Sequence, residues 1–219
     1  MDFIAHPEIA PLWIIAILVS LTVHEWAHAF AAWKLGDETA RRDGRLTLNP
    51  LAHIDPLGAV LFVLVGFGWA KPVPVDARNF RHPVRDSAIV AAAGPGSNLV
   101  LALAALFVGR FVVVDLAGDS GIVEQVTRMC SLLLASLANV NLALMAFNLL
   151  PVPPLDGSNI LRLFLPWRMR DRYDELFGYG PWIIIGVLFV ESFLGIPVIS
   201  AWVEFVIQGV RHAAWAILG

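Results

Sequence analysis

Long apolar stretches separated by short polar ones divide this chain into segments of about membrane thickness. A helix needs about 20 mainly apolar residues to cross the hydrocarbon core of a bilayer, which is about 30 Å thick. Five stretches approach or exceed this length and are predicted to be transmembrane helices: residues 11–33, 88–114, 129–150, 181–195 and 198–218. The pattern therefore predicts an all-α polytopic membrane protein with about five transmembrane helices.

A sixth apolar stretch, residues 57–70, has only about 14 residues and is too short to cross comfortably. Residues 71–75 follow it, and their alternating prolines exclude a helix but suit an extended edge strand. We therefore predict that residues 45–75 form a re-entrant, partly β hairpin. Non-helical backbone at membrane depth needs protein cover or a water-filled cavity, so this hairpin is expected beside a functional site.

The distribution of basic residues predicts the orientation in the membrane. If residues 57–70 dip in and return, 13 Lys and Arg residues lie on one side and 2 on the other. Positive charge is retained on the cytoplasmic side. The chain is thus expected to be a multi-pass protein of the cell membrane, with its N-terminus outside and its C-terminus in the cytoplasm.

Composition agrees with a membrane protein and excludes several other classes. Hydrophobic residues make up 58% of the chain and charged residues 15%, against about 45–50% and about 25% in soluble proteins. The net charge of −3, with no basic tract, gives no case for nucleic-acid binding. A single cysteine excludes an internal disulfide and a cysteine zinc cluster. We expect one domain, residues 1–219, with a core at about 10–165 and two closing helices at about 181–218.

The first apolar segment contains the sequence His24-Glu25-Trp26-Ala27-His28. Residues i and i+4 share one face of a helix, so His24 and His28 can bind one metal ion. Glu25 is placed to take a proton from a water molecule at that metal. The alternative is a pair of buried structural histidines. Ionisable groups inside a membrane are costly and usually mark a site, which favours metal binding.

A third ligand is needed, because catalytic zinc usually has three protein ligands and one water. Asp156 is the candidate: it follows the proline-rich break at residues 151–154, near the cytoplasmic end of the third span, and precedes a short helix. The dipole of that helix favours the ionised carboxylate that a metal requires. A helix N-cap in a tight turn explains the same residue equally well.

At this point the chain resembles the site-2 protease family, the intramembrane zinc metalloproteases of peptidase family M50. Two motifs carry the resemblance, residues 24–28 and the Asn-Leu-Leu-Pro-Val-Pro-Pro-Leu-Asp-Gly stretch at 148–157, with support from residues 49–58, 71–75 and 94–98. The resemblance implies that His24, His28 and Asp156 hold one Zn²⁺ per chain and that Glu25 is the general base. It also implies an active site near the cytoplasmic face and a transmembrane protein as substrate. The chain resembles the small prokaryotic branch without PDZ or CBS domains.

Other polar residues have both functional and structural explanations. By the resemblance, Asn148 is expected to bind the oxyanion or the substrate backbone. The alternative is an interhelical hydrogen bond, for which Asn139 and Asn141 are equal candidates. His53 and Asp55 fit a contact to the site or to substrate, but turn bonding explains them too. Asn98 could lie behind the metal ligands or simply join two helices.

Two other functions are compatible with histidines and an aspartate in membrane spans. A metal transporter would need polar residues through both halves of the membrane, whereas here they cluster near one face. A catalytically inactive membrane scaffold would be expected to lack a ligand or the base, and all four residues are present. The predicted function is therefore proteolysis within the membrane. The sequence predicts neither the identity of the substrate nor an oligomeric state.

Overall fold

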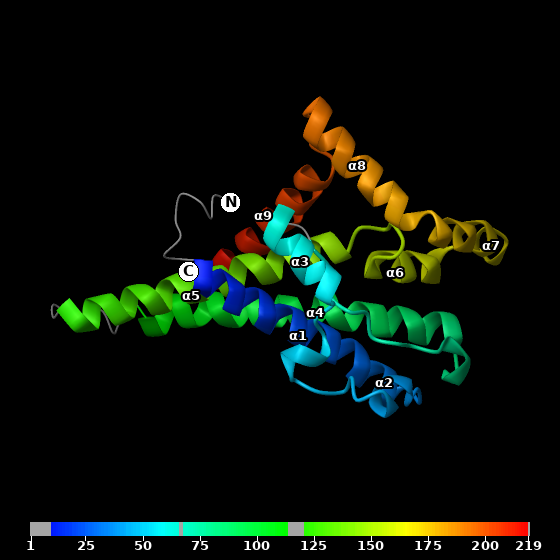
Figure 1. Cartoon of the computed structure of the whole chain (residues 1–219), viewed down its shortest axis with the longest axis horizontal. Coiled ribbons are helices and arrows are strands. Elements are labelled where there is room, and N and C mark those ends of the chain that lie inside the picture. The colour runs from blue at the N-terminus through cyan, green and yellow to red at the C-terminus, as the bar shows by residue number, and fades with distance from the viewer. Residues whose placement is uncertain (1–9, 66–67, 114–120, 219) are drawn as a thin grey trace.

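A computed structural model describes residues 10–65, 68–113 and 121–218 of the chain (Figure 1). Its regular structure is helical throughout these ranges. The helices are α1 (Ala10–Lys34), α2 (Thr39–Arg42), η2 (Pro50–Ala52), α3 (Pro56–Val65), η3 (Ala77–Asn79), α4 (Pro83–Val108), η4 (Gly109–Val113), α5 (Gly121–Asn148), α6 (Asp156–Phe164), α7 (Trp167–Glu175), η5 (Leu176–Gly178), α8 (Gly180–Leu194) and α9 (Ile199–Leu218).

The long helices α1, α4 and α5 lie side by side and form the centre of the molecule, with α6 packed on α4 (Figure 1). Small residues occupy the contacts between these helices: Ala16, Ala29, Ala32, Ala102 and Ala146 are all fully buried. Lipid tails are as apolar as leucine, so membrane helices associate through close packing rather than by hiding apolar surface from water. Alanine at the contacts permits that close approach.

Among the described residues, three helices are long and apolar enough to cross a membrane: Ala10–Lys34, Pro83–Phe111 and Gly121–Asn148. A fourth is counted if Trp167–Gly178 and Gly180–Leu194, which are bent by 69° against each other, form one broken span. The chain is thus an all-α membrane protein, but the predicted count of five spans is not supported. At 1.5 Å per residue, the 15 residues of α8 reach only about 22 Å. The apolar sequence of α9 is interrupted by the polar residues Glu204, Gln208 and Arg211.

The prediction of a partly β hairpin at residues 45–75 is wrong for the residues that the structure describes. Residues 57–65 belong to α3, and the two flanks of α3 meet only in one isolated antiparallel bridge between Ile54 and Ala70. Prolines 72 and 74 lack the N–H groups that a ladder needs. The carbonyls of Lys71 and Pro72 instead accept hydrogen bonds from Arg45, at 2.5 and 3.2 Å.

Helix α9 runs antiparallel to α5, which does not fit the expected cytoplasmic C-terminus. The Trp202 indole donates to Ala146 O near the end of α5, and further along α9 Arg211 donates to Asn139 Oδ1, earlier in α5. The last turns of α9 therefore lie at the end of the molecule where α1 begins (Figure 1). The charge count could not detect this, because only one basic residue, Arg211, lies in the segment concerned.

Candidate metal centre and catalytic site

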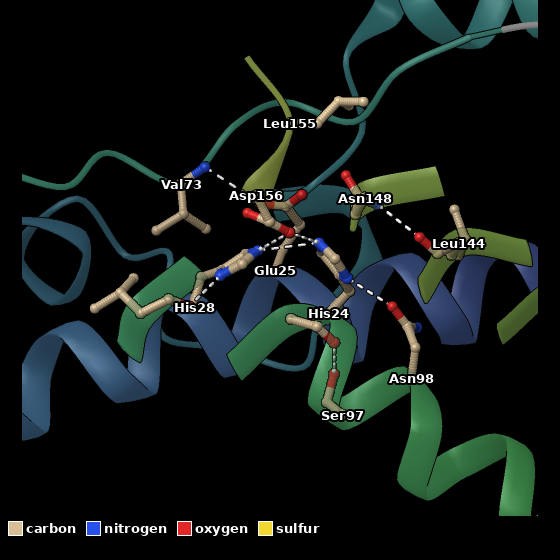
Figure 2. A network of polar contacts seen from close by, with 12 residues as sticks. His24, Glu25, His28, Val73, Ser97, Asn98, Leu144, Asn148, Leu155 and Asp156 are labelled. Carbon is tan, nitrogen blue, oxygen red and sulfur yellow. Dashed lines mark hydrogen bonds and ion pairs between the residues drawn. The ribbon is translucent and has the colours of Figure 1, made fainter. Parts of the chain in front are cut away.

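Two imidazoles on one face of α1 point at the same position between the central helices (Figure 2). His24 and His28 are one helical turn apart and both are buried. Their Nε2 atoms lie 3.0 Å from each other. The helical period of 3.6 residues is sufficient to explain this convergence, because it places residues i and i+4 next to each other.

Asp156 brings a carboxylate to the same position from the first residue of α6. Its Oδ2 lies 3.3 Å from Nε2 of both His24 and His28. In the described part of the chain this buried oxygen has no hydrogen-bond partner. The close approach of α6 to the end of α5 depends on Gly157, where a Cβ would collide with the carbonyls of Leu149 and Leu150.

The three atoms have the spacing that a single zinc ion requires. They lie 3.0 to 3.3 Å apart, and ligand atoms at about 2.0–2.1 Å from a tetrahedral zinc lie about 3.3 Å from one another. Two imidazole nitrogens and one carboxylate oxygen are ligands that zinc accepts, and three protein ligands leave one position for water. A buried carboxylate oxygen without a hydrogen bond also fits a ligand better than a helix cap.

The other nitrogen of each imidazole has its own acceptor. Nδ1 of His24 lies 2.6 Å from Asn98 Oδ1 (Figure 2). Nδ1 of His28 lies 2.8 Å from Val90 O. An acceptor at Nδ1 retains the proton there and leaves the lone pair on Nε2 for a metal. Both histidines thus have an acceptor at Nδ1 and leave Nε2 toward the shared position, an arrangement that suits metal ligands.

Glu25 lies one residue beyond His24 and is buried. Its Oε2 accepts a hydrogen bond of 3.2 Å from the backbone N–H of Val73, in the extended segment 71–76 that we call the strap (Figure 2). Arg45 holds the strap through the carbonyls of Lys71 and Pro72, and Asp37 Oδ2 holds it through the Asp76 N–H at 2.8 Å. The strap thus connects the candidate base to two buried charged residues in the loop after α1.

Asp37 lies outside the spans and is suited to this role because it remains anionic. Burial raises the pKa of Asp37, but hydrogen bonds from Thr39, Asn79 and the Asp76 backbone outweigh burial and hold the pKa below its ordinary value. A carboxylate that accepts several N–H and O–H groups is stabilised in its charged form. Asp37 therefore fixes the strap against the end of α1 at neutral pH.

Comparison with known proteins identifies the family of this chain. The sequence profile of the family described as "Peptidase family M50" matches residues 105–190 of the chain. The chain is 40% identical over 204 residues to the "Putative zinc metalloprotease YwhC" of Bacillus subtilis, covering 91% of each protein. It is 32% identical over 192 residues to the "Putative zinc metalloprotease Rip2" of Mycolicibacterium smegmatis, covering 84% of this chain and 67% of the relative. The chain belongs to peptidase family M50. No solved structure matches it.

The remaining residues predicted for this M50 site lie in different surroundings. Asn148 ends α5 and donates to Leu144 O of its own helix at 3.0 Å, so its expected role toward substrate stays a prediction (Figure 2). His53 is buried between Thr47 O and Arg45, and these hydrogen-bond partners include none of the three metal-ligand candidates. Asp55 accepts from Gly58 N at the start of α3, as an N-cap does.

Some residues around this site were not identified from the sequence, or were identified only as candidates for an interhelical hydrogen bond. Ser20 and Asn141 are fully buried and lie behind Asn98. Ser20 had a signal, because it lies four residues before His24 on the same helix face. Asn139 and Asn141 were equal candidates for an interhelical hydrogen bond, and both form one: Asn141 with Asn98 and Ser20, and Asn139 with Arg211. Arg45 and Asp37 reach the site only through the strap, a contact between segments far apart in sequence.

Proposed function

We propose that this M50 protein is an intramembrane zinc metalloprotease that hydrolyses peptide bonds within or near transmembrane segments of membrane-protein substrates. The observation that carries the proposal is the convergence of His24, His28 and Asp156 on one point between membrane-length helices, with Glu25 adjacent. Structural histidines alone would not explain the carboxylate oxygen that lies beside them without a hydrogen bond.

Each of these residues has a proposed role in the reaction. His24, His28 and Asp156 would hold the zinc, which when bound supplies a Lewis acid that activates water and polarises the scissile carbonyl. Glu25 accepts the proton of the attacking water and delivers it to the leaving amine. Asn148 donates to the oxyanion or to the substrate backbone, which requires its amide to leave Leu144 O. A helical substrate must unwind before its peptide bond can be attacked.

The proposal includes a location as well as a reaction. We infer regulated cleavage of single-span proteins at the cell membrane, with the site near the cytoplasmic face and the N-terminus of this chain outside. The excess of Lys and Arg in loops 34–45, 71–85 and 162–172 supports this orientation. Asp156 follows α5 at the same end of the molecule as these loops.

Two substitutions test the proposal in detergent-solubilised protein. Glu25→Gln is expected to retain one zinc per chain while cleavage of a flexible membrane-protein substrate falls by about 10²–10⁴-fold, the usual contribution of general acid–base catalysis. His24→Ala is expected to lose zinc and cleavage together. Zinc content is measured by atomic emission and cleavage by gel.

The same measurements separate the alternatives. Unimpaired cleavage by Glu25→Gln would contradict the role of Glu25 as base. Zinc flux into liposomes by a wild-type protein that cleaves nothing would favour a transporter instead. A wild-type protein with neither zinc nor cleavage would indicate an inactive scaffold.

A further inference from the structure

His24 can bind a metal through Nε2 only if its proton is on Nδ1. A neutral imidazole carries one N–H and one lone pair, and the partner of one nitrogen decides where the proton resides. For His28 the partner is Val90 O, which can only accept. For His24 the partner is the side-chain amide of Asn98, which presents either an acceptor or a donor depending on its rotation.

A chain of buried side chains continues from Asn98 across three helices. Asn98 Nδ2 donates to Asn141 Oδ1 at 2.7 Å, and Asn141 Nδ2 donates to Ser20 Oγ at 2.7 Å. Asn98, Asn141 and Ser20 are each completely buried, on α4, α5 and α1 respectively. The rotation of one amide therefore dictates the rotation of the next, because a donor must face an acceptor at every step.

Two backbone carbonyls favour one direction of this series of hydrogen bonds over the reverse direction. Asn141 Nδ2 also donates to Leu137 O at 2.8 Å, and Asn98 Nδ2 lies 3.4 Å from Ser20 O. If either amide were flipped, its oxygen would face a carbonyl oxygen, and a hydrogen bond would be replaced by a repulsive contact between two acceptors. Ser20 Oγ donates its own proton to Ala16 O at 2.6 Å, so it accepts from Asn141.

We propose that Asn98 and Asn141 form a polarised pair of amides that fixes His24 with its proton on Nδ1 and its lone pair toward the metal. Asn141 is thus a positioning residue for a metal ligand that it does not touch, and it acts from a different membrane helix. The orientation is set by Leu137 O and Ser20 O and is transmitted through Asn98 Oδ1 to the imidazole. This inference rests on the proposed zinc function.

Zinc affinity of Asn141 variants tests the proposal. Asn141→Leu has nearly the shape of asparagine but removes the 2.7 Å acceptor for Asn98 Nδ2, so that only the longer contact of 3.4 Å to Ser20 O still opposes rotation of Asn98. We expect its zinc affinity to fall by about 10–100-fold, the usual effect of losing a residue that orients a metal ligand. Asn141→Asp keeps an acceptor oxygen toward Asn98 and is expected to bind zinc much more tightly than Asn141→Leu.

Asn139→Leu is the matched control, because it makes the same substitution two residues away on α5, where the side chain accepts from Arg211 instead. Affinity is measured by competition with a chelator on folded, monodisperse protein. Wild-type affinity in Asn141→Leu, or an equal loss in Asn141→Asp and Asn141→Leu, would overturn the proposal. A wild type that binds no zinc would refute the proposed function itself, so the two failures are distinguishable.

A second measurement uses only the wild-type protein, so it does not require any variant to fold. In protein carrying ¹⁵N-histidine and loaded with ¹¹³Cd, both histidine ligands should show coupling of the metal to Nε2 and a protonated Nδ1. Coordination of either histidine through Nδ1 would contradict the proposed orientation.

Discussion

At the residue scale, Gly94 lies against the two imidazoles because it has no side chain. A Cβ at this position would lie 2.6 Å from Cε1 of His24 and would also collide with the ring of His28. We predict that Gly94→Ala displaces both rings and lowers zinc affinity and cleavage by more than tenfold, since a displacement of about 1 Å at a catalytic site can cost about 10²-fold. The measurements are zinc affinity by chelator competition and cleavage by gel.

Gly96 is the matched control for this substitution. It lies on the same helix, two residues away, and a Cβ there would meet nothing within 4 Å. Gly96→Ala should therefore bind zinc and cleave like the wild type. Equal zinc affinity in Gly94→Ala and Gly96→Ala would show that the rings do not need this contact.

The residues that the sequence identified are those whose relation is local or belongs to a family motif. His24, Glu25 and His28 share one helix, so their spacing alone places them together. The prediction of Asp156 as a ligand depended on the family resemblance, because its position before a short helix allowed a helix cap equally well. The position of Asn141 behind His24 and the contact of Arg45 with the strap could not be predicted, since each depends on which helix or strap faces the residue. No periodicity within one segment encodes a contact between two segments.

At the scale of the element, the strap connects the loop after α1 to the candidate base through one backbone N–H. Val73→Pro removes that N–H but suits the extended chain between Pro72 and Pro74. We predict that this variant keeps its zinc and cleaves about 10- to 100-fold more slowly, because a hydrogen bond to a charged group contributes about 1.5–3 kcal/mol. Initial cleavage rates and zinc content, measured on the same preparation, test this.

Val73→Ala removes the side chain and keeps the N–H, so it controls for lost packing. It should cleave at close to the wild-type rate. If Val73→Pro is as active as Val73→Ala, the strap does not orient Glu25.

The elements themselves were predicted unevenly, for a physical reason. Apolar runs of 20 or more residues gave α1, α4 and α5, because membrane thickness dictates their length. The segment around α3 was expected to pair as a hairpin, but paired strands need free N–H groups that Pro72 and Pro74 lack. Arg45 satisfies the carbonyls of the strap instead. Which group satisfies a backbone carbonyl is a tertiary property that composition does not contain.

At the scale of the whole molecule, the contacts of α9 predict that both ends of the chain lie on one side of the membrane. Helices α1 and α5 begin at the same end, and α9 runs antiparallel to α5 toward that end (Figure 1). If the loop at residues 71–85 lies in the cytoplasm, a tag at the C-terminus is expected outside the cell. Sequence charge alone predicted the opposite for this terminus.

Thiol labelling of intact cells distinguishes the two arrangements. In a Cys130→Ser background, which removes the single native cysteine, a cysteine in a tag after Gly219 should react with a membrane-impermeant maleimide, as should Glu124→Cys. Arg81→Cys should react only after the membrane is opened. A tag that is protected together with Arg81→Cys would instead support the arrangement with a cytoplasmic C-terminus, and would require α8 and α9 to cross as a separate pair.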